Sequence, residues 1–321
     1  MKAVITDDRH HHYEVEKAIL EPLGFDVVVL GEGTKDELLA NCRDADALLA
    51  NLALIDREVV ESLEKCRVIS RYGVGFDNVD VAACTEKGIQ VGYAPHYCEN
   101  EVAEHALALI MSCARRTTSR DRKIRQGQWN ISDKIVRIAG KTCGILGFGH
   151  IAQGFCERVR GFGFAEILAY DPYLDADFIA GFGARKASFE EVLTKADFIS
   201  VHIPLNPSTR GIINKEAFAL MKPDAVIVNT ARGPVIDQQA LIDTLAAGKL
   251  NGVGLDVYDT EPLALDSPLR QFDNVVLTDH TGYYSEESLV DLKTITAQNV
   301  AEVFAGRPPL FIVPPQKDVK F

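Results

Sequence analysis

Short apolar runs alternate with stretches of helical periodicity along the whole chain, and this alternation constrains the fold more than any other feature. Such runs predict buried strands, and the segments between them have the spacing of amphipathic helices. Strand and helix in repeated alternation are typical of parallel-sheet α/β proteins. The predicted strands form two groups, residues 2–6, 25–30, 45–50, 67–71 and 90–92, then residues 142–146, 166–170, 198–203, 225–230, 252–257 and 274–278.

Two longer helical segments divide these groups into domains. One predicted helix opens at Asn100, a plausible N-cap, with Glu101 and Glu104 in its first turn, and ends at a basic pair of arginines. The other covers residues 286–304. We therefore expect two doubly wound parallel-sheet domains: residues 100–285 are inserted into a flavodoxin-like domain made of residues 1–99 and 286–321.

A glycine motif follows the first strand of the second group. Gly147, Gly149 and Ala152 follow an apolar run and open a helical one, and Asp171 ends the next strand. In this layout the glycines permit a sharp turn and close approach of a pyrophosphate, which the helix N-terminus then binds. A carboxylate at the position of Asp171 accepts bonds from ribose hydroxyls and repels a 2′-phosphate. The inserted domain is therefore predicted to be a Rossmann domain that binds NAD rather than NADP.

Composition excludes several other classes of protein. The net charge of −12 argues against a nucleic-acid partner. No apolar run approaches the ~20 residues of a membrane span, and the first residues enter a strand without a signal-peptide pattern. We therefore expect a cytoplasmic protein with no membrane partner. The seven cysteines are scattered without a Cys-x-x-Cys pair, so neither a disulfide framework nor a metal site is predicted.

Three polar segments follow the last three predicted strands, residues 229–234, 255–262 and 278–282. Hydride transfer to a 2-keto acid requires a planar cation for the carboxylate and carbonyl oxygen, and a proton donor for the developing alkoxide. Arg232 suits the first role and His280 the second. A carboxylate beside the histidine would orient the ring and stabilise its protonated form, which suits Glu261.

At this point the chain resembles the D-isomer-specific 2-hydroxyacid dehydrogenases over nearly its whole length. The resemblance lies in residues 71–78, the glycine motif, residues 170–173, residues 202–205, the Thr-Ala-Arg-Gly segment at 230–233, residues 256–262 and His280. Residues 280–287, together with 71–78 and 170–174, are most similar to the C-terminal binding protein corepressors of this family.

The resemblance implies a role for each matching residue. Arg232 would bind and polarise the keto acid, His280 would be the general acid and base, and Glu261 its partner. The substrate would also contact Val74, Gly75 and Tyr283, and Asp256 would hold the nicotinamide carboxamide. The remaining implied cofactor residues are Gly147, Gly149, His150, Ile151, Asp171, Ile203, Pro204, Asn206, Thr209, Thr230, Ala231 and Gly282, with Arg232 and His280 also in contact. A homodimer built around the helix near Asn100 is implied as well.

The expected activity is NAD-dependent reduction of a small 2-keto acid, or the reverse reaction. Leu52 occupies a position where relatives that act on phosphorylated acids tend to have arginine or serine, which weakens 3-phosphoglycerate as the substrate. Tyr283 would suit an apolar or small aromatic keto acid. Two alternatives stay open: an NAD(H)-sensing, corepressor-like binding protein with little turnover, and, third, a phosphite or formate oxidoreductase. Asp279 and Pro234 depart from the family's usual pattern without removing a catalytic group.

Two further clusters lie outside these motifs. Residues 10–12 are three consecutive histidines, which favour a solvated turn over a set of metal ligands. Contact of Arg9 or one of these histidines with the distal end of the substrate stays open. The basic cluster at residues 115–125 is expected to be a solvated face or part of a dimer contact rather than a polyanion site.

Overall fold

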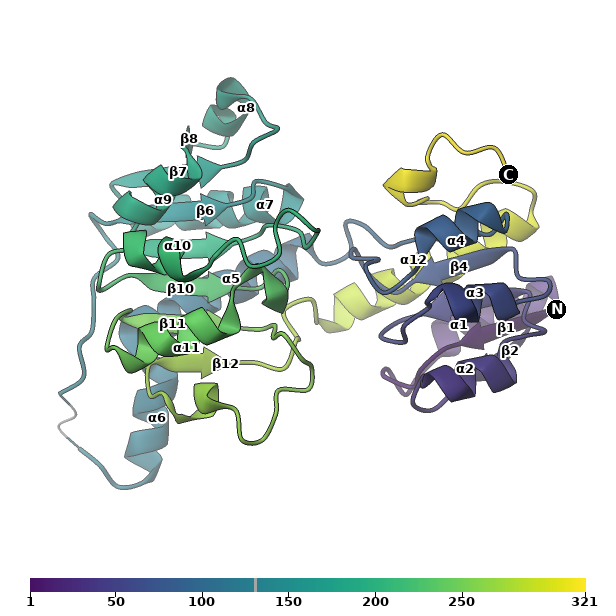
Figure 1. Cartoon of the computed structure of the whole chain (residues 1–321), viewed down its shortest axis with the longest axis horizontal. Helices are drawn as coiled ribbons and strands as arrows, with labels where there is room; N and C mark the ends of the chain where they lie inside the picture. Colours follow the sequence, from purple (N-terminus) through teal and green to yellow (C-terminus); the bar gives the residue numbers. More distant parts are fainter. Residues whose placement is uncertain (130–131) are drawn as a thin grey trace. The chain divides into compact units, whose positions relative to one another are not determined.

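The computed structural model describes residues 1–129 and 132–321, which form two compact units. The first unit contains Met1–Cys98 and Ser285–Phe321, and the second contains Glu99–Tyr284. Each unit is built on its own parallel sheet (Figure 1). In the described part of the chain, no helix is both long enough and apolar enough to cross a membrane.

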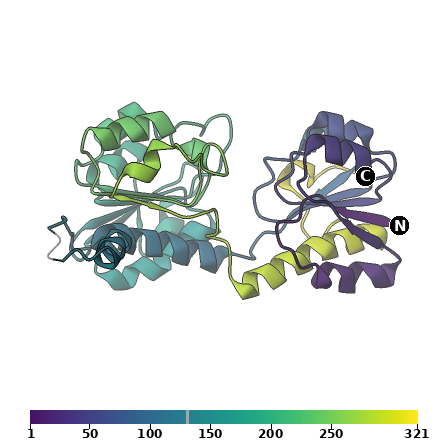
Figure 2. The same ribbon diagram turned by 90° about the horizontal axis from the view of Figure 1, so that it is seen from below.

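The first unit has five strands in the order β2-β1-β3-β4-β5, which is the flavodoxin-like arrangement. Helices cover both faces of this sheet, with α1 and α12 on one face (Figure 2). The strands are β1 Lys2–Ile5, β2 Asp26–Val29, β3 Ala47–Ala50, β4 Val68–Arg71 and β5 Gln90–Gly92. The helices are α1 Glu14–Leu20, α2 Lys35–Asn41, α3 Arg57–Ser62, α4 Val81–Glu86 and α12 Glu286–Phe304, with short 3₁₀ turns at Glu21–Leu23 and Pro314–Gln316.

The second unit has seven strands in the order β12-β11-β10-β9-β6-β7-β8. Read from its first strand, β6, this is the doubly wound order of dinucleotide-binding sheets with one strand added at an edge. The strands are β6 Thr142–Leu146, β7 Glu166–Tyr170, β8 Arg185–Lys186, β9 Phe198–Val201, β10 Val226–Asn229, β11 Gly252–Leu255 and β12 Val275–Leu277. Six strands were expected here; β8 was missed because it contains only two residues, both charged.

Helices also cover both faces of the second sheet (Figure 2). The helices are α5 Glu99–Arg115, α6 Thr117–Arg125, α7 His150–Val159, α8 Ala176–Gly181, α9 Phe189–Lys195, α10 Lys215–Leu220 and α11 Gln238–Ala246, with 3₁₀ turns at Arg160–Phe162, Gly233–Val235 and Pro268–Gln271. The long helix α5 begins at Glu99, one residue before the expected N-cap. The Asn100 side chain instead accepts a hydrogen bond from Arg158 Nη2 at 2.8 Å.

The helix α5 lies unusually close to the sheet because two residues of β11 have no side chain. A Cβ atom on Gly252 would lie 2.7 Å from Cys113 Cβ, and one on Gly254 would lie 2.9 Å from Leu109 Cβ. Real Cβ atoms almost never approach so closely, so the glycines permit this packing. The two glycines therefore set how closely α5 can approach β11.

Ordinary physical rules account for the other elements. Strands β3, β9, β10 and β11 are buried along their whole length, as expected for central strands of a sheet covered on both faces. Side-chain N-caps begin many of the helices, and one capping box, formed by Ser285 and Ser288, begins α12. All seven cysteines are buried and act as small apolar side chains.

One buried amide joins α12 to the rest of the first unit. Asn299 is fully buried, and its Nδ2 donates to Ser70 Oγ at 3.1 Å and to the Tyr93 carbonyl at 3.0 Å. Its Oδ1 accepts the Phe311 N–H at 3.0 Å. This one side chain therefore satisfies groups from β4, from the segment after β5 and from the segment after α12.

We predict that Asn299→Leu lowers the free energy of unfolding by about 3 to 5 kcal/mol, since each buried polar group left unpaired costs ~1–3 kcal/mol. The measurement is urea unfolding followed by circular dichroism. Gln298→Leu is the matched control, because Gln298 is the exposed neighbour on the same helix and should change stability by less than about 0.5 kcal/mol. Equal effects of the two substitutions would contradict this account of Asn299.

Candidate active site

Most of the predicted site residues follow the carboxyl ends of strands in the second unit, along one side of its sheet. Strand β6 pairs with β7 on one side and with β9 on the other, so the chain reverses its direction of winding at β6. In doubly wound sheets, ligands bind outside the carboxyl ends at such a switch point. The glycine motif, residues 147–152, follows β6 at this point.

The glycine turn is specified by steric contacts. Gly147 has a φ of +84°, and a Cβ atom there would lie 2.8 Å from the His202 carbonyl oxygen. Gly149 is the N-cap of α7, and a Cβ atom at that position would meet no atom within 4 Å. Ala152 is fully buried against the sheet. The turn therefore leaves open space at the N-terminus of a ten-residue helix, which favours an anion.

Asp171 lies beside this turn. Its Oδ2 accepts the Phe148 N–H at 3.0 Å, and its Oδ1 accepts the Tyr173 N–H at 2.9 Å. A carboxylate has about four acceptor positions, so these two bonds fix its orientation and leave capacity for ligand hydroxyls. The arrangement fits the ribose of a dinucleotide.

The loop after β9 and the end of β10 form the next part of the edge. Ile203 is buried, while Pro204, Asn206 and Thr209 form a turn in which Thr209 Oγ1 donates to the Pro204 carbonyl at 2.6 Å. At the end of β10, the Thr230 hydroxyl is buried and has no hydrogen-bond partner among the described residues. Because buried hydroxyls in proteins are normally paired, this one fits a ligand contact, as the implied NAD would supply.

Arg232, Glu261 and His280 follow three neighbouring strands, β10, β11 and β12. A close backbone contact positions Arg232, because a Cβ atom on the next residue, Gly233, would lie 2.0 Å from the Tyr258 carbonyl carbon. Arg232 Nη1 donates to the Ala231 carbonyl at 2.8 Å. The loop that carries the arginine therefore packs directly on the loop that carries Glu261.

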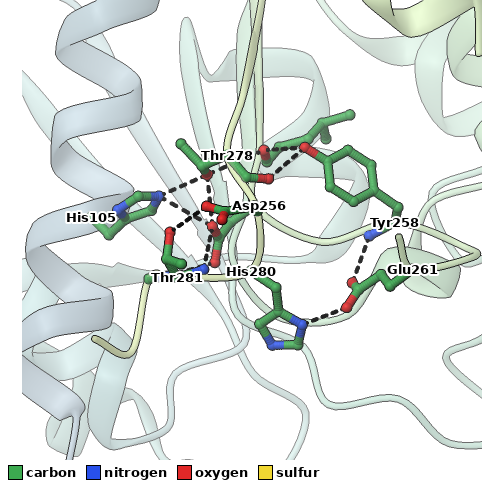
Figure 3. Close-up of polar contacts among 10 residues, drawn as sticks. His105, Asp256, Tyr258, Glu261, Thr278, His280 and Thr281 are labelled. Atoms are coloured by element: carbon green, nitrogen blue, oxygen red, sulfur yellow. Dashed lines mark hydrogen bonds and ion pairs between the residues drawn. The ribbon is translucent and has the colours of Figure 1, made fainter. Parts of the chain in front are cut away.

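His280 and Glu261 form a short ion pair (Figure 3). His280 Nδ1 donates to Glu261 Oε2 at 2.6 Å, and Glu261 Oε1 accepts the Tyr258 N–H at 3.0 Å. Their side chains remain 28% and 34% exposed, so a substrate can reach them. Burial raises the pKa of Glu261, but the hydrogen bond and charge of His280, the Tyr258 N–H and the charge of Arg232 lower it below its usual value. The Glu261 carboxylate is therefore ionised, and it orients the His280 ring through the bond to Nδ1.

Asp256 is buried at the end of β11 and binds the segment that carries His280 (Figure 3). Its Oδ1 accepts from Thr278 Oγ1 at 2.6 Å and from the Thr281 N–H at 3.0 Å, and its Oδ2 accepts the Gly282 N–H at 2.9 Å. Burial raises the pKa of Asp256, but hydrogen bonds from His105, Thr278 and Gly282 and the charge of His105 lower it to about 2. A contact with a carboxamide stays a prediction.

Sequence reasoning missed His105, whose Nε2 lies 2.9 Å from Thr278 Oγ1 and 3.4 Å from Asp256 Oδ1. A signal was present. His105 follows Val102 by three residues and precedes Leu109 by four, so it lies on the apolar stripe of the predicted helix. A polar residue on a buried face requires a partner, although the sequence does not say which.

The other predicted substrate residues lie in different parts of the molecule. Tyr283 belongs to the second unit, and its ring centroid lies 6.3 Å from that of His280 in an edge-on arrangement. Val74 and Gly75 belong to the first unit, in the segment after β4, and the Val74 side chain is exposed. The structure therefore brings Tyr283 together with Arg232, Glu261 and His280, whereas Val74 and Gly75 lie in the other unit.

The three histidines after β1 have separate environments. His10 is half-buried and packs against the Tyr72 ring, and burial, followed by the charges of Lys293 and Arg9, lowers its pKa to about 4. His11 is exposed beside Asp8. The His12 carbonyl accepts a hydrogen bond from Lys293 Nζ at 2.5 Å. His10 is thus uncharged near neutral pH, and each histidine has a different neighbour.

We predict that Gly233→Ala lowers the free energy of unfolding by about 2 to 4 kcal/mol, because the added Cβ would overlap backbone atoms that cannot move aside separately. Thermal unfolding of the purified variant measures the loss. Gly181→Ala is the control, since a Cβ atom on this last residue of α8 would meet nothing within 4 Å. A Gly233→Ala variant as stable as the control would show that the Arg232 and Tyr258 loops are not packed as described.

Comparison with known proteins identifies the family. Residues 107–282 match the family model of the D-isomer specific 2-hydroxyacid dehydrogenase, NAD binding domain. The chain is 40% identical over 309 residues to D-3-phosphoglycerate dehydrogenase of Methanocaldococcus jannaschii, covering 95% of this chain and 58% of that protein. It is 36% identical over 282 residues to glyoxylate reductase of Korarchaeum cryptofilum, covering 86% and 85% of the two chains.

Solved structures agree with this assignment. A glyoxylate reductase from Paecilomyes thermophila superposes with a TM-score of 0.89 at 32% identity over 99% of both chains. D-lactate dehydrogenase from Aquifex aeolicus, complexed with NAD and lactic acid, superposes with a TM-score of 0.85 at 26% identity over 95% of this chain and 96% of that one.

The chain spans little more than half the length of the phosphoglycerate dehydrogenases that it matches, 58% in Methanocaldococcus and 52% in Mycobacterium tuberculosis. None of the relatives named here confirms the expected likeness to the corepressor branch. The expected two-domain fold and the NAD-binding Rossmann domain are confirmed. The chain belongs to the family of D-isomer specific 2-hydroxyacid dehydrogenases.

Proposed function

We propose that this protein is an NAD-dependent D-2-hydroxyacid dehydrogenase that interconverts a small 2-keto acid and the D-2-hydroxy acid. The observation that carries the proposal is the ion pair between His280 and Glu261 at the same sheet edge as Arg232, in a chain of this family. The two curated relatives named above have dehydrogenase and reductase activities of this kind in their names.

We assign the two units separate tasks. The second unit holds NAD through the glycine turn, with the diphosphate at the N-terminus of α7 and the ribose hydroxyls on Asp171. Ile203, Pro204, Asn206, Thr209 and the 230–232 segment line the cofactor, and His150, Ile151, Asp256, His280 and Gly282 complete its contacts. The first unit receives the substrate carboxylate on the backbone of Val74 and Gly75.

The chemistry requires few protein groups. Bound NADH supplies a hydride to the carbonyl carbon of the keto acid. Arg232 binds the substrate carboxylate and polarises the carbonyl oxygen, since a guanidinium presents paired donors in one plane. His280, protonated, gives its Nε2 proton to that oxygen as negative charge develops there. Glu261 holds Nδ1 and stabilises the imidazolium; the ring then takes a proton from water, so that the net reaction consumes one proton.

The substrate is proposed to be a small keto acid without a phosphate group. Tyr283 lies beside His280, and Leu52 and Leu54 in the loop after β3 are 52% and 60% exposed. Apolar side chains at these positions would favour an apolar substituent over a phosphate if the substrate contacts them. Because several relatives are named phosphoglycerate dehydrogenases, a phosphorylated keto acid belongs in any test of this point.

We also propose that the protein is a cytoplasmic homodimer that uses α5 and α6, without a nucleic-acid or membrane partner. Ile124 and Trp129, in and just after α6, are 44% and 78% exposed. Acidic residues of the same chain pair the basic side chains of this region, as in Arg122 with Asp273 and Lys123 with Asp133. Because acidic residues of the same chain already neutralise these basic side chains, the α6 region is better suited to contact with another protein than to binding a polyanion.

We predict steady NADH consumption on a panel of glyoxylate, pyruvate, hydroxypyruvate, phenylpyruvate and phosphohydroxypyruvate, with a nonphosphorylated acid as the best substrate. His280→Ala should lower kcat about 10²- to 10⁴-fold, because it removes the proton donor. Gln298→Ala is the control, since Gln298 is exposed on α12 and is none of the residues assigned to the site. NADH binding without turnover on any member would contradict the proposal and favour the NAD(H)-sensing alternative.

We predict that the wild type prefers NADH to NADPH and that Asp171→Ala weakens this preference at least about tenfold, because the carboxylate repels a 2′-phosphate. The measurement is kcat/KM for each cofactor at saturating keto acid. Asp175→Ala, in the same loop, is the control, since this exposed N-cap of α8 makes no capping bond. A wild-type preference for NADPH would contradict the role given to Asp171.

A further inference from the structure

His105 connects a helix to the loop that carries the proposed proton donor. It lies on the sheet-facing side of α5, and its side chain is 22% exposed. Its Nε2 contacts Thr278 Oγ1 and lies near Asp256 Oδ1, at 2.9 and 3.4 Å (Figure 3). The hydrogen-bonded network consists of His105, Asp256, Thr278, Thr281 and Gly282, and of these residues His105 is the one that comes from a helix.

The hydrogen-bond directions in this cluster can be assigned. A threonine hydroxyl has one proton, and Thr278 Oγ1 is 2.6 Å from Asp256 Oδ1 but 3.4 Å from the Leu255 carbonyl. The hydroxyl therefore donates to Asp256. It must then accept from His105, so the ring carries its proton on Nε2. A side chain without a donor at this point would leave the Thr278 hydroxyl with one bond fewer, and this hydroxyl is the group that donates to Asp256.

Close packing fixes the distance from His105 to this cluster. The contacts of Gly252 with Cys113 and of Gly254 with Leu109 hold α5 against β11. A Cβ atom on Gly282 would lie 3.3 Å from His105 Cδ2 and 2.8 Å from Asp256 Oδ2. The His105 ring, the Asp256 carboxylate and the backbone of residue 282 therefore fill one compact space.

Asp256 in turn holds the chain on both sides of His280. It binds Thr278 two residues before the histidine, and the N–H groups of Thr281 and Gly282 just after it. His280 itself has a φ of +56°, in the left-handed region that is unfavourable for a non-glycine residue. These flanking bonds hold the backbone in that conformation and so direct the ring toward Glu261.

We propose that His105 is a positioning residue for the reaction: through Thr278 and Asp256 it fixes the backbone that places the His280 ring. The inference rests on the proposed function, in which His280 is the proton donor. His105 does not itself touch the reacting atoms. It acts by keeping the 278–282 segment in one conformation, so its loss affects the chemical step more than the binding of keto acid.

The test compares His105→Leu, which removes the donor, with His105→Gln, which keeps an N–H donor. Ile110→Ala is the control, because Ile110 is a fully buried residue of α5 that is not among the contacts of the β11 glycines named above. We expect His105→Leu to lower kcat about 10- to 100-fold, as misplacement of a reacting group does, with little change in KM for the keto acid. His105→Gln should stay within about threefold of the wild type, and Ile110→Ala should lower the melting temperature without this loss of kcat.

A second measurement does not depend on turnover. Hydrogen exchange of the Thr281 and Gly282 amides, both bonded to Asp256, should accelerate about tenfold or more in His105→Leu and recover in His105→Gln. If His105→Leu does not fold, Thr278→Val removes the bridging hydroxyl and should give the same two effects.

The outcomes separate this inference from the proposed function. Unchanged amide exchange at residues 281 and 282, or equal losses of kcat in the His105→Leu, His105→Gln and Ile110→Ala variants, would overturn the role of His105. Absence of turnover in the wild type would overturn the proposed function, and the exchange measurement would still decide the role of His105 in fixing the segment.

Discussion

The buried carboxylate of Asp256 is the interaction on which the arrangement of the candidate site depends. It joins the end of β11 to Thr278 after β12 and to the Thr281 and Gly282 N–H groups. An ionised group that is removed from water is stabilised only when it is well paired. The segment that carries His280 supplies those partners, so its conformation and the stability of the buried charge are coupled. A change in the conformation of this segment would therefore weaken the pairing of the Asp256 carboxylate, and loss of the carboxylate would release the segment.

Close backbone contacts bring the other groups to the same edge of the sheet. Gly147 allows the turn after β6 to lie against the His202 carbonyl, and Gly233 allows the Arg232 loop to lie against Tyr258. Gly252 and Gly254 do the same for α5. At each of these positions a side chain as small as a methyl group would have to push backbone or packed atoms apart. The geometry of the site thus depends on these glycines, which have no side chain, as much as on the residues with functional side chains.

Much of the fold could be predicted from the sequence because its signals are local. Buried parallel strands are continuous apolar runs, and the end of each run marks the edge where ligand-binding residues belong. For this reason Gly147, Asp171, Arg232, Glu261 and His280 could be assigned in advance to the carboxyl ends of strands. The two-residue strand β8 had no such signal. The start of α5 was displaced because Arg158 binds the Asn100 side chain instead.

The hydrogen bonds that join His105, Thr278 and Asp256 could not be predicted in the same way, because they connect distant parts of the chain. His105 and Thr278 are 173 residues apart in the sequence yet 2.9 Å apart in the structure. Helical periodicity places His105 on a buried face but does not identify its partner. Likewise, the carboxylate of Asp256 was assigned to a ligand on the basis of resemblance, whereas its bonds to residues 278, 281 and 282 could be seen only in the fold.

In the proposed reaction, NADH transfers a hydride to the carbonyl carbon of a keto acid while His280 protonates the carbonyl oxygen. The most direct test is to follow the label from nicotinamide-deuterated NADH with pyruvate as substrate, in ordinary water. We expect deuterium at C2 of the product, D configuration at that carbon and a slower reaction than with unlabelled NADH. An unlabelled product, or the L enantiomer, would contradict the account.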